Sequence, residues 1–119
     1  PFLYTIVGPQ ASAQIRQYST SLSVNASGQL VVSYGIFGVE NPMIELGAYS
    51  IKIQQKVTST KWQTLQTIDG TSSNDQWYHT QEEIVDVAVG IYRAEIELFA
   101  TNAAGTDTRT AYTVEKAVA

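Results

Sequence analysis

Apolar and polar side chains alternate at every second position along most of this chain, and no stretch of ten or more residues has the spacing of an amphipathic helix. Such alternation is typical of β-strands with one buried and one exposed face. The clearest run covers residues 92–100, and its inward-facing positions are Tyr92, Ala94, Ile96, Leu98 and Ala100. A second run covers residues 49–57, with inward-facing positions Tyr49, Ile51, Ile53, Gln55 and Val57. The pattern predicts an all-β chain.

Clusters of Gly, Pro, Asn, Ser and Thr separate the predicted strands. Turns or loops are expected at residues 25–28, 38–42, 69–76 and 101–106. In the strand predicted over residues 61–68, Trp62 and Ile68 share one face and Leu65 lies on the other, which indicates a bulge or a strand packed on both faces. The last long strand is expected to turn Tyr112 and Val114 inward. The pattern favours a sandwich of about seven strands over a small barrel.

The segment 86–94, DVAVGIYRA, resembles the corner between the fifth and sixth strands of immunoglobulin-like domains. The resemblance implies that the Tyr92 hydroxyl binds a backbone group a few residues upstream. Ala94 stands where antibody domains have a cysteine, so no disulfide is expected. The stretch IELFATNAAGT is also similar to fibronectin type III domains, with Ala100, Asn102 and Gly105 at matching places, although Tyr92 lies two residues further upstream than usual. The predicted fold is an antiparallel, immunoglobulin-like two-sheet sandwich.

Residues 18–115 are similar in their order of motifs to small secreted β-sandwich proteins of Gram-positive bacteria that have no assigned activity. This resemblance implies an extracellular or cell-surface location. Residues 1–14 have two interpretations. Phe2–Val7 is either an edge strand or, with the small residues Ala11 and Ala13 behind it, the remnant of an export signal. Residues 15–119 are expected to form a single domain.

Composition narrows the classes of function. The chain of 119 residues has no cysteine, which excludes disulfides, thiol nucleophiles and cysteine-bound metals. Seven Lys and Arg against eleven Asp and Glu give a net charge of -4, so nucleic acid is not an expected partner. The longest apolar run, Phe2–Val7, is far shorter than the roughly 20 residues that a membrane-spanning helix needs. No membrane span is predicted.

Catalytic motifs are weak. His79 is the only histidine, no GxSxG motif is present, and we interpret His79 as a surface strand residue. Glu95 and Glu97 lie roughly 7 Å apart on one strand face, within the spacing that glycosidases use. The competing interpretation is a solvated face on which Arg93 shares charge with Glu95. A small glycoside hydrolase therefore stays as an alternative to a non-enzymatic function.

Metal and cofactor motifs are weak as well. Oxygen ligands for calcium could come from Asp69, Asn74 and Asp75, but the alternating register of a calcium loop is absent. No metal site, phosphate loop or cofactor is predicted.

Aromatic residues are the remaining signal. Burial between the sheets is expected for Tyr34, Tyr49, Trp62, Tyr92 and Tyr112. A candidate binding patch is predicted at Trp77, Tyr78 and Phe99, which if exposed together would mark a partner-binding surface. The hypothesis is a secreted, non-enzymatic module for recognition or surface structure, with a protein or a glycan as partner. One alternative is a carbohydrate-binding module, and another is an assembly subunit that pairs strand edges.

Overall fold

The computed structural model describes the backbone of residues 5–7 and all of residues 12–119. Within them, seven strands have eight or more residues and three have three residues. The long strands are β2 (Ile15–Val24), β3 (Leu30–Gly38), β4 (Glu45–Thr58), β5 (Lys61–Asp69), β7 (Tyr78–Val85), β8 (Gly90–Asn102) and β9 (Gly105–Tyr112). The short strands are β1 (Thr5–Val7), β6 (Ser72–Asn74) and β10 (Lys116–Val118). No helix long and apolar enough to cross a membrane occurs in this part of the chain.

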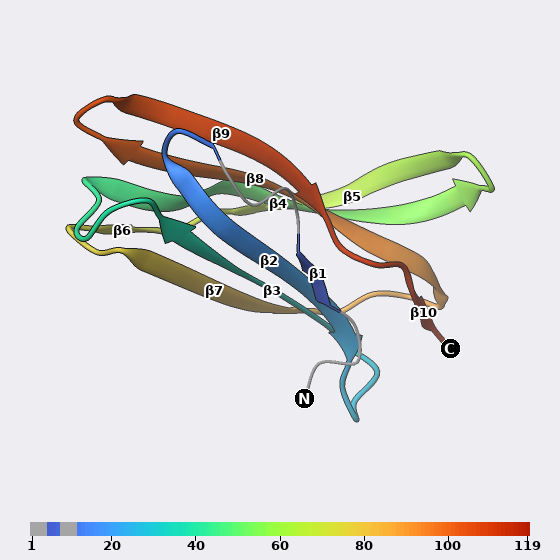
Figure 1. Cartoon of the computed structure of the whole chain (residues 1–119). Coiled ribbons are helices and arrows are strands. Elements are labelled where there is room, and N and C mark those ends of the chain that lie inside the picture. The colour runs from blue at the N-terminus through green and yellow to red at the C-terminus, as the bar shows by residue number, and fades with distance from the viewer. Residues whose placement is uncertain (1–4, 8–11) are drawn as a thin grey trace.

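The strands form two antiparallel sheets that pack face to face (Figure 1). The first sheet has the order β1-β2-β3-β7. The second has the order β10-β8-β4-β5, with β6 beside β4 and β9 beside β8. Because β8 occupies one side of β4, β5 and β6 share the other side and pair with successive parts of it. The prediction of an all-β, two-sheet antiparallel sandwich is confirmed.

Strand β8 supplies the centre of the core. Its even-numbered side chains from position 92 to position 100 are all buried against the first sheet, as the alternation predicts. The inward residues Leu30, Val32, Tyr34 and Ile36 of β3 face them from the other layer. Apolar burial between two such layers, at roughly 25 cal/mol per Å², is the main source of stability in a chain without disulfides.

The corner before β8 also agrees with the prediction. The ring of Tyr92 is buried, and its hydroxyl donates a hydrogen bond of 2.7 Å to the carbonyl of Ala88. The turn between β2 and β3 lies at residues 25–28, where the Asn25 side-chain oxygen accepts bonds from the backbone N–H groups of Ser27 and Gln29. Leu65 is the extra residue of a bulge, because Ile53 pairs with Gln66 and Gln54 pairs with Thr64.

Several predicted face assignments are wrong, and irregular pairing explains the first of them. Tyr49 is 54% exposed because it is an extra residue in β4, between Ala48 opposite Leu98 and Ser50 opposite Glu97. Val57 is exposed at a second irregularity, next to the turn into β5.

On the neighbouring strands, the predicted faces of two more aromatic residues are inverted. Tyr112 pairs with the outward-facing Glu95, so Ala111 and Thr113 are buried in its place. Val114 is only half-buried. Trp62 pairs with Lys56 and lies half-buried on the outer face of the second sheet, under Arg93.

The polar loop predicted over residues 69–76 is not wholly a loop, because Ser72–Asn74 forms β6 and pairs with β4. At the N-terminus, Thr5–Val7 pairs with β2 at the edge of the first sheet. The rest of the Phe2–Val7 prediction, and the residues Gly8 to Ala11, lie outside the described residues.

Candidate functional site

Three aromatic side chains gather at one end of the first sheet. Phe37 is the next-to-last residue of β3 and pairs with Tyr78, the first residue of β7. The Trp77 ring lies 5.3 Å from Phe37 and 5.2 Å from Tyr78 between centroids, and Phe37 and Tyr78 are 6.2 Å apart. Trp77 is 37% exposed and Tyr78 is 45% exposed. We call Phe37, Trp77 and Tyr78 the aromatic patch.

The backbone around the patch is fixed by hydrogen bonds between two segments far apart in the sequence. The N–H of Gly38 donates to the carbonyl of Trp77, and the N–H of Met43 donates to the carbonyl of Gln76, each at 2.8 Å. The Met43 side chain is buried and packs against Gly38, where a Cβ atom would stand 2.1 Å from its Cγ. Glycine at position 38 therefore allows loop 39–44 to close onto the residues before β7.

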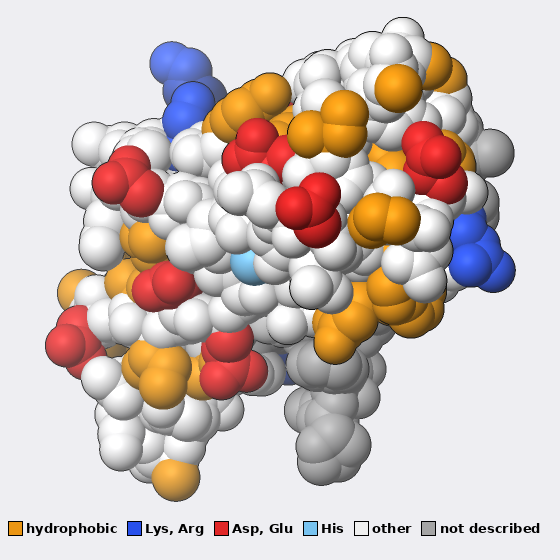
Figure 2. All heavy atoms as spheres, turned by 90° about the vertical axis from the view of Figure 1, so that its left-hand side faces the viewer, with side chains coloured by type: hydrophobic (Ala, Val, Ile, Leu, Met, Phe, Trp, Pro, Cys, Tyr) orange, Lys and Arg blue, Asp and Glu red, His pale blue; other side chains and the backbone are white. Residues whose placement is uncertain are grey.

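Further apolar side chains are exposed on the same loops. Val39 and Ile44 flank Met43, and both are more than two-fifths exposed. The N–H of Ile44 donates to the carbonyl of Thr101, which brings the turn between β8 and β9 to the same end. Figure 2 shows this end of the sandwich, where apolar and acidic side chains are interspersed among other polar groups.

A pocket of about 360 Å³ opens beside the patch and is lined by Ser73, Gln76, Tyr78, His79 and Thr80. The His79 ring, on β7, contacts Ser73 of β6 and Thr71, which lies just before β6. Its Nε2 atom lies 2.8 Å from the Thr71 hydroxyl, and its Nδ1 atom lies 2.6 Å from the Ser73 hydroxyl. Burial lowers the pKa of His79 below its ordinary value, which favours the neutral ring. One ring nitrogen of a neutral histidine donates and the other accepts, so both hydroxyls can be satisfied.

A buried polar network lies next to His79, whose ring is 6.1 Å from that of Tyr34 between centroids. The Tyr34 hydroxyl lies 2.8 Å from the Gln81 side-chain oxygen, to which it donates, and 3.1 Å from the Thr71 carbonyl. The N–H of Thr71 donates to the same Gln81 oxygen. Burial raises the pKa of Tyr34 to about 12, so the phenol stays protonated. The network ties β3 and β7 to Thr71, which lies just before β6.

The structure separates the third predicted patch residue from the other two. Phe99 is only 5% exposed and lies on the outer face of the second sheet, where it stacks on Tyr49 with centroids 4.3 Å apart. Trp77 and Tyr78 belong to the end of the first sheet. Phe37 replaces Phe99 as the third member of the group, and the sequence alone gave no reason to pair Phe37 with Trp77.

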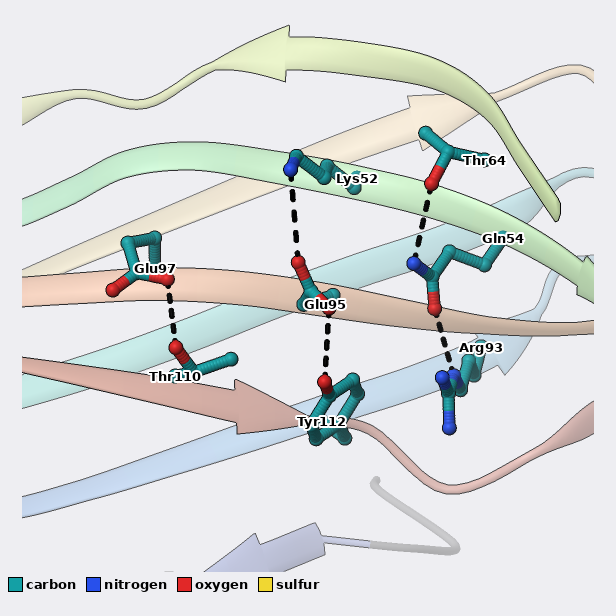
Figure 3. Close-up of polar contacts among 8 residues, drawn as sticks. All are labelled: Lys52, Gln54, Thr64, Arg93, Glu95, Glu97, Thr110 and Tyr112. Atoms are coloured by element: carbon teal, nitrogen blue, oxygen red, sulfur yellow. Dashed lines mark hydrogen bonds and ion pairs between the residues drawn. The ribbon is translucent and has the colours of Figure 1, made fainter. Parts of the chain in front are cut away.

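The outer face of the second sheet carries an ordered row of polar and aromatic groups. The guanidinium of Arg93 lies between the rings of Trp62 and Tyr112, at 4.4 and 4.5 Å from their centroids. Its Nε atom donates to the side-chain oxygen of Gln54, whose amide nitrogen donates to Thr64 (Figure 3). These contacts hold the Arg93 side chain against its own sheet, between two rings and the Gln54 side chain.

Glu95 and Glu97 lie on this same face. Glu95 accepts a hydrogen bond from Tyr112 and lies 3.8 Å from Lys52, and Glu97 accepts one from Thr110 (Figure 3). A glycosidase needs one desolvated carboxyl group to act as a general acid. Both glutamates are only partly buried among polar partners, so the geometry gives no support to the hydrolase hypothesis.

The calcium hypothesis also lacks a ligand cluster. Among the described residues, no group of three or more His, Asp or Glu side chains could hold a metal ion. The backbone of Asn74 pairs with Glu45 in the sheet, and the N–H of Asp75 donates to the Ile44 carbonyl. The backbone of residues 74–75 therefore pairs with the start of β4, in the connection that leads to β7.

Comparisons of the chain with protein-family models, with curated proteins and with solved structures found no match. Among the surfaces described, the aromatic patch and its pocket combine exposed rings, converging loops and a hollow. We take them as the candidate functional site.

Proposed function

We propose that this chain is a non-enzymatic recognition module that binds a protein partner through the aromatic patch. The single observation that carries the proposal is the mutual contact of Trp77 and Tyr78, which remain exposed at an end where three loops meet. Tryptophan and tyrosine are enriched among the residues that dominate binding energy, because they bury large rings at low entropic cost. The Phe37 ring packs near both of them, with centroids 5.3 Å from Trp77 and 6.2 Å from Tyr78.

An immunoglobulin-like or fibronectin type III-like fold is part of this proposal. Strands β2, β3 and β7 face β4, β8 and β9, which corresponds to the A, B and E strands facing C, F and G of the immunoglobulin fold. The hydrogen bond from Tyr92 occurs where that fold has its tyrosine corner. In this correspondence loop 39–44 is the B–C loop and the β8–β9 turn is the F–G loop. These two loops form part of the binding end of variable immunoglobulin domains.

We further propose that the module acts outside the cell or at its surface. The absence of cysteine, the low content of charged residues and the resemblance to secreted β-sandwich proteins support this location. Immunolabelling of intact and of permeabilised source cells would test it. Labelling only after permeabilisation would contradict the proposal.

A carbohydrate partner is the second candidate, since the polar pocket lies directly beside Tyr78. Sugar rings stack best on aromatic rings that share a plane, whereas the planes of Trp77 and Tyr78 are 68° apart. The ring geometry therefore favours a protein partner.

The test is to screen the purified chain against arrays of proteins, peptides and glycans, beside a Trp77→Ser, Tyr78→Ser double variant. The matched control is Val57→Ser, Ile84→Ser, which removes two exposed apolar side chains outside the patch. We expect protein or peptide ligands that the control retains and the double variant loses. An unchanged binding profile for the double variant, or no ligand for the wild-type chain, would overturn the proposal.

A further inference from the structure

Most of the charge around the aromatic patch is acidic. One basic residue lies close to it along the sheet, the exposed Arg16, which is the extra residue of β2 opposite Gly38 and Phe37. Residues 17–51 contain two acidic residues and no Lys or Arg, and residues 62–92 contain five acidic residues and no Lys or Arg. These two stretches supply all three rings of the patch and the whole lining of the pocket. Figure 2 agrees, because acidic side chains spread among the apolar ones on this end and basic ones lie mainly at the margins of the view.

Three exposed carboxylates lie on the segments that carry the patch or close onto it, and we call them the bordering carboxylates. Glu40 lies in the loop that closes onto it, Asp75 lies two residues before Trp77, and Glu82 shares the outer face of β7 with Tyr78. The two ion pairs found among the described residues, Lys52 with Glu95 and Lys56 with Glu115, involve other acidic groups. The charge of the border is therefore not neutralised by an ion pair within the described chain.

We propose that the partner is a basic protein segment in which Lys or Arg side chains alternate with apolar ones. This inference rests on the proposed function and adds the chemistry of the ligand. Apolar side chains of the segment contact the patch, and its cations reach the bordering carboxylates. The faces of Trp77 and Tyr78 attract cations as well, because an aromatic ring carries negative charge density on its face.

Apart from the exposed Arg16 on the neighbouring strand β2, the immediate surroundings of the patch do not oppose a cation. His79 lines the pocket beside Tyr78 and is held between two neutral hydroxyl groups. The charged groups that lie nearest along β7 are Glu82 and Glu83, and Glu83 already accepts a hydrogen bond from Gln81. Long-range attraction by such a surface raises the association rate and weakens as salt screens it.

The probe is a short synthetic peptide of alternating Arg and Leu, with peptides of alternating Gln and Leu and of alternating Glu and Leu as comparisons. Binding is measured by calorimetry at low and high salt, and the site is located from the shifts of backbone and indole N–H signals in NMR spectra. We expect the Arg peptide to bind at least about tenfold more tightly than the Gln peptide at low salt, with shifts at Trp77 and Tyr78. This preference should shrink at high salt.

The charge is tested with the variant Glu40→Gln, Asp75→Asn, Glu82→Gln. Asparagine suits position 75, where φ is 56°, because Asn and Asp tolerate the left-handed region. All three residues are exposed, so the fold should survive and the affinity for the Arg peptide should fall by about tenfold.

The matched control is Glu95→Gln, Glu97→Gln, Glu115→Gln, which changes the net charge equally on other surfaces. It should bind the Arg peptide as the wild type does. Equal weakening in both triple variants would mean that net charge alone acts, and would overturn the inference.

The remaining outcomes separate the inference from the proposed function. The Gln peptide or a neutral glycan could bind as tightly as the Arg peptide, and the double variant Trp77→Ser, Tyr78→Ser could abolish that binding. In that case the patch is a binding site, but the proposal of a basic partner is wrong. If the Arg peptide binds equally well to that double variant, both proposals fail. Absence of binding by the Arg peptide overturns the inference alone, and the array experiment then decides the proposed function.

Discussion

The hydroxyl of Tyr92 offers a sharp test of how the two sheets are joined. The Tyr92 side chain is 1% exposed at the start of β8, and its hydroxyl reaches Ala88 in the segment that crosses from the first sheet to the second. A Tyr92→Phe substitution keeps the ring in the core and removes only this hydrogen bond. The change therefore isolates the connection between the crossing segment and the core.

The expected loss of stability follows from the surroundings of the two atoms. A hydrogen bond contributes a net of about 0.5–1.5 kcal/mol, and a buried partner left unsatisfied costs about 1–3 kcal/mol. Because Ala88 is an exposed residue, water can reach its carbonyl when the hydroxyl is gone. We therefore expect Tyr92→Phe to lower the free energy of unfolding by the net value of the hydrogen bond, about 0.5–1.5 kcal/mol.

Urea unfolding followed by tryptophan fluorescence measures this difference. The midpoint should fall while the slope of free energy against urea stays constant, because the surface exposed on unfolding does not change. The matched control is Tyr112→Phe, which removes a hydroxyl bound to Glu95 on the exposed outer face. Its effect should stay within about 0.5 kcal/mol. Equal midpoints for Tyr92→Phe and the wild type would refute the corner as a source of stability.

The remaining predictions concern packing and protonation. Ile96→Ala, at a fully buried contact between the sheets, should lower the free energy of unfolding by about 2–5 kcal/mol in the same assay, and a cost below about 0.5 kcal/mol would contradict the packing. Gly38→Ala should lower the free energy of unfolding by about 1–3 kcal/mol, because the new Cβ atom would overlap the buried Met43 side chain. Amide hydrogen exchange in loop 39–44 should become faster in this variant, and unchanged exchange would argue against the role of this glycine. Because the folded-state pKa of His79 is lowered, the unfolded chain binds the proton more readily, and the free energy of unfolding should fall as the pH drops below about 6.5; a His79→Gln variant should lack this component. Because the pKa of Tyr34 is raised to about 12, stability should fall as the pH rises above about 10, and a pH profile of Tyr34→Phe that declines as steeply would contradict that cause.

Regular strands could be predicted from the sequence, and irregular ones could not. Strand β8 pairs with β4 on one side and with β9 on the other, so its alternation of apolar and charged residues maps directly onto an inner and an outer face. In β4 the same alternation fails at Tyr49, where an extra residue shifts the faces. A bulge is a property of two paired strands, and the spacing within one strand does not contain it.

Aromatic residues misled the face assignment for a different reason. Trp62 and Tyr112 are large enough to suggest burial, yet they lie on the outer face of the second sheet with Arg93 between them. The cation covers both rings and replaces part of the contact that a core would give. Arg93, which makes this arrangement favourable, is on a third strand, β8. The residues next to Trp62 or Tyr112 in the sequence do not indicate this contact.

The candidate site was accessible to sequence reasoning only in part. Trp77 and Tyr78 could be predicted as candidate binding residues because they stand at the start of a predicted strand and do not fit its inward-facing positions. Phe99 was grouped with them although the strand order places it in the other sheet. The contact between Ser73 and His79 was not predicted, because it depends on β6, a strand of three residues inside a polar stretch.

The position of the site follows from the same packing that stabilises the sandwich. The Met43 side chain, in loop 39–44, points into the core, and its backbone N–H donates to the carbonyl of Gln76, next to Trp77. The loop therefore cannot move away from the aromatic patch without exposing a core side chain. Two exposed rings held in this way lose little conformational freedom when a partner binds, because most of the ordering cost is already met on folding. The Gly38→Ala variant connects the two properties, since loosening Met43 should weaken ligand binding at the patch as well as the fold.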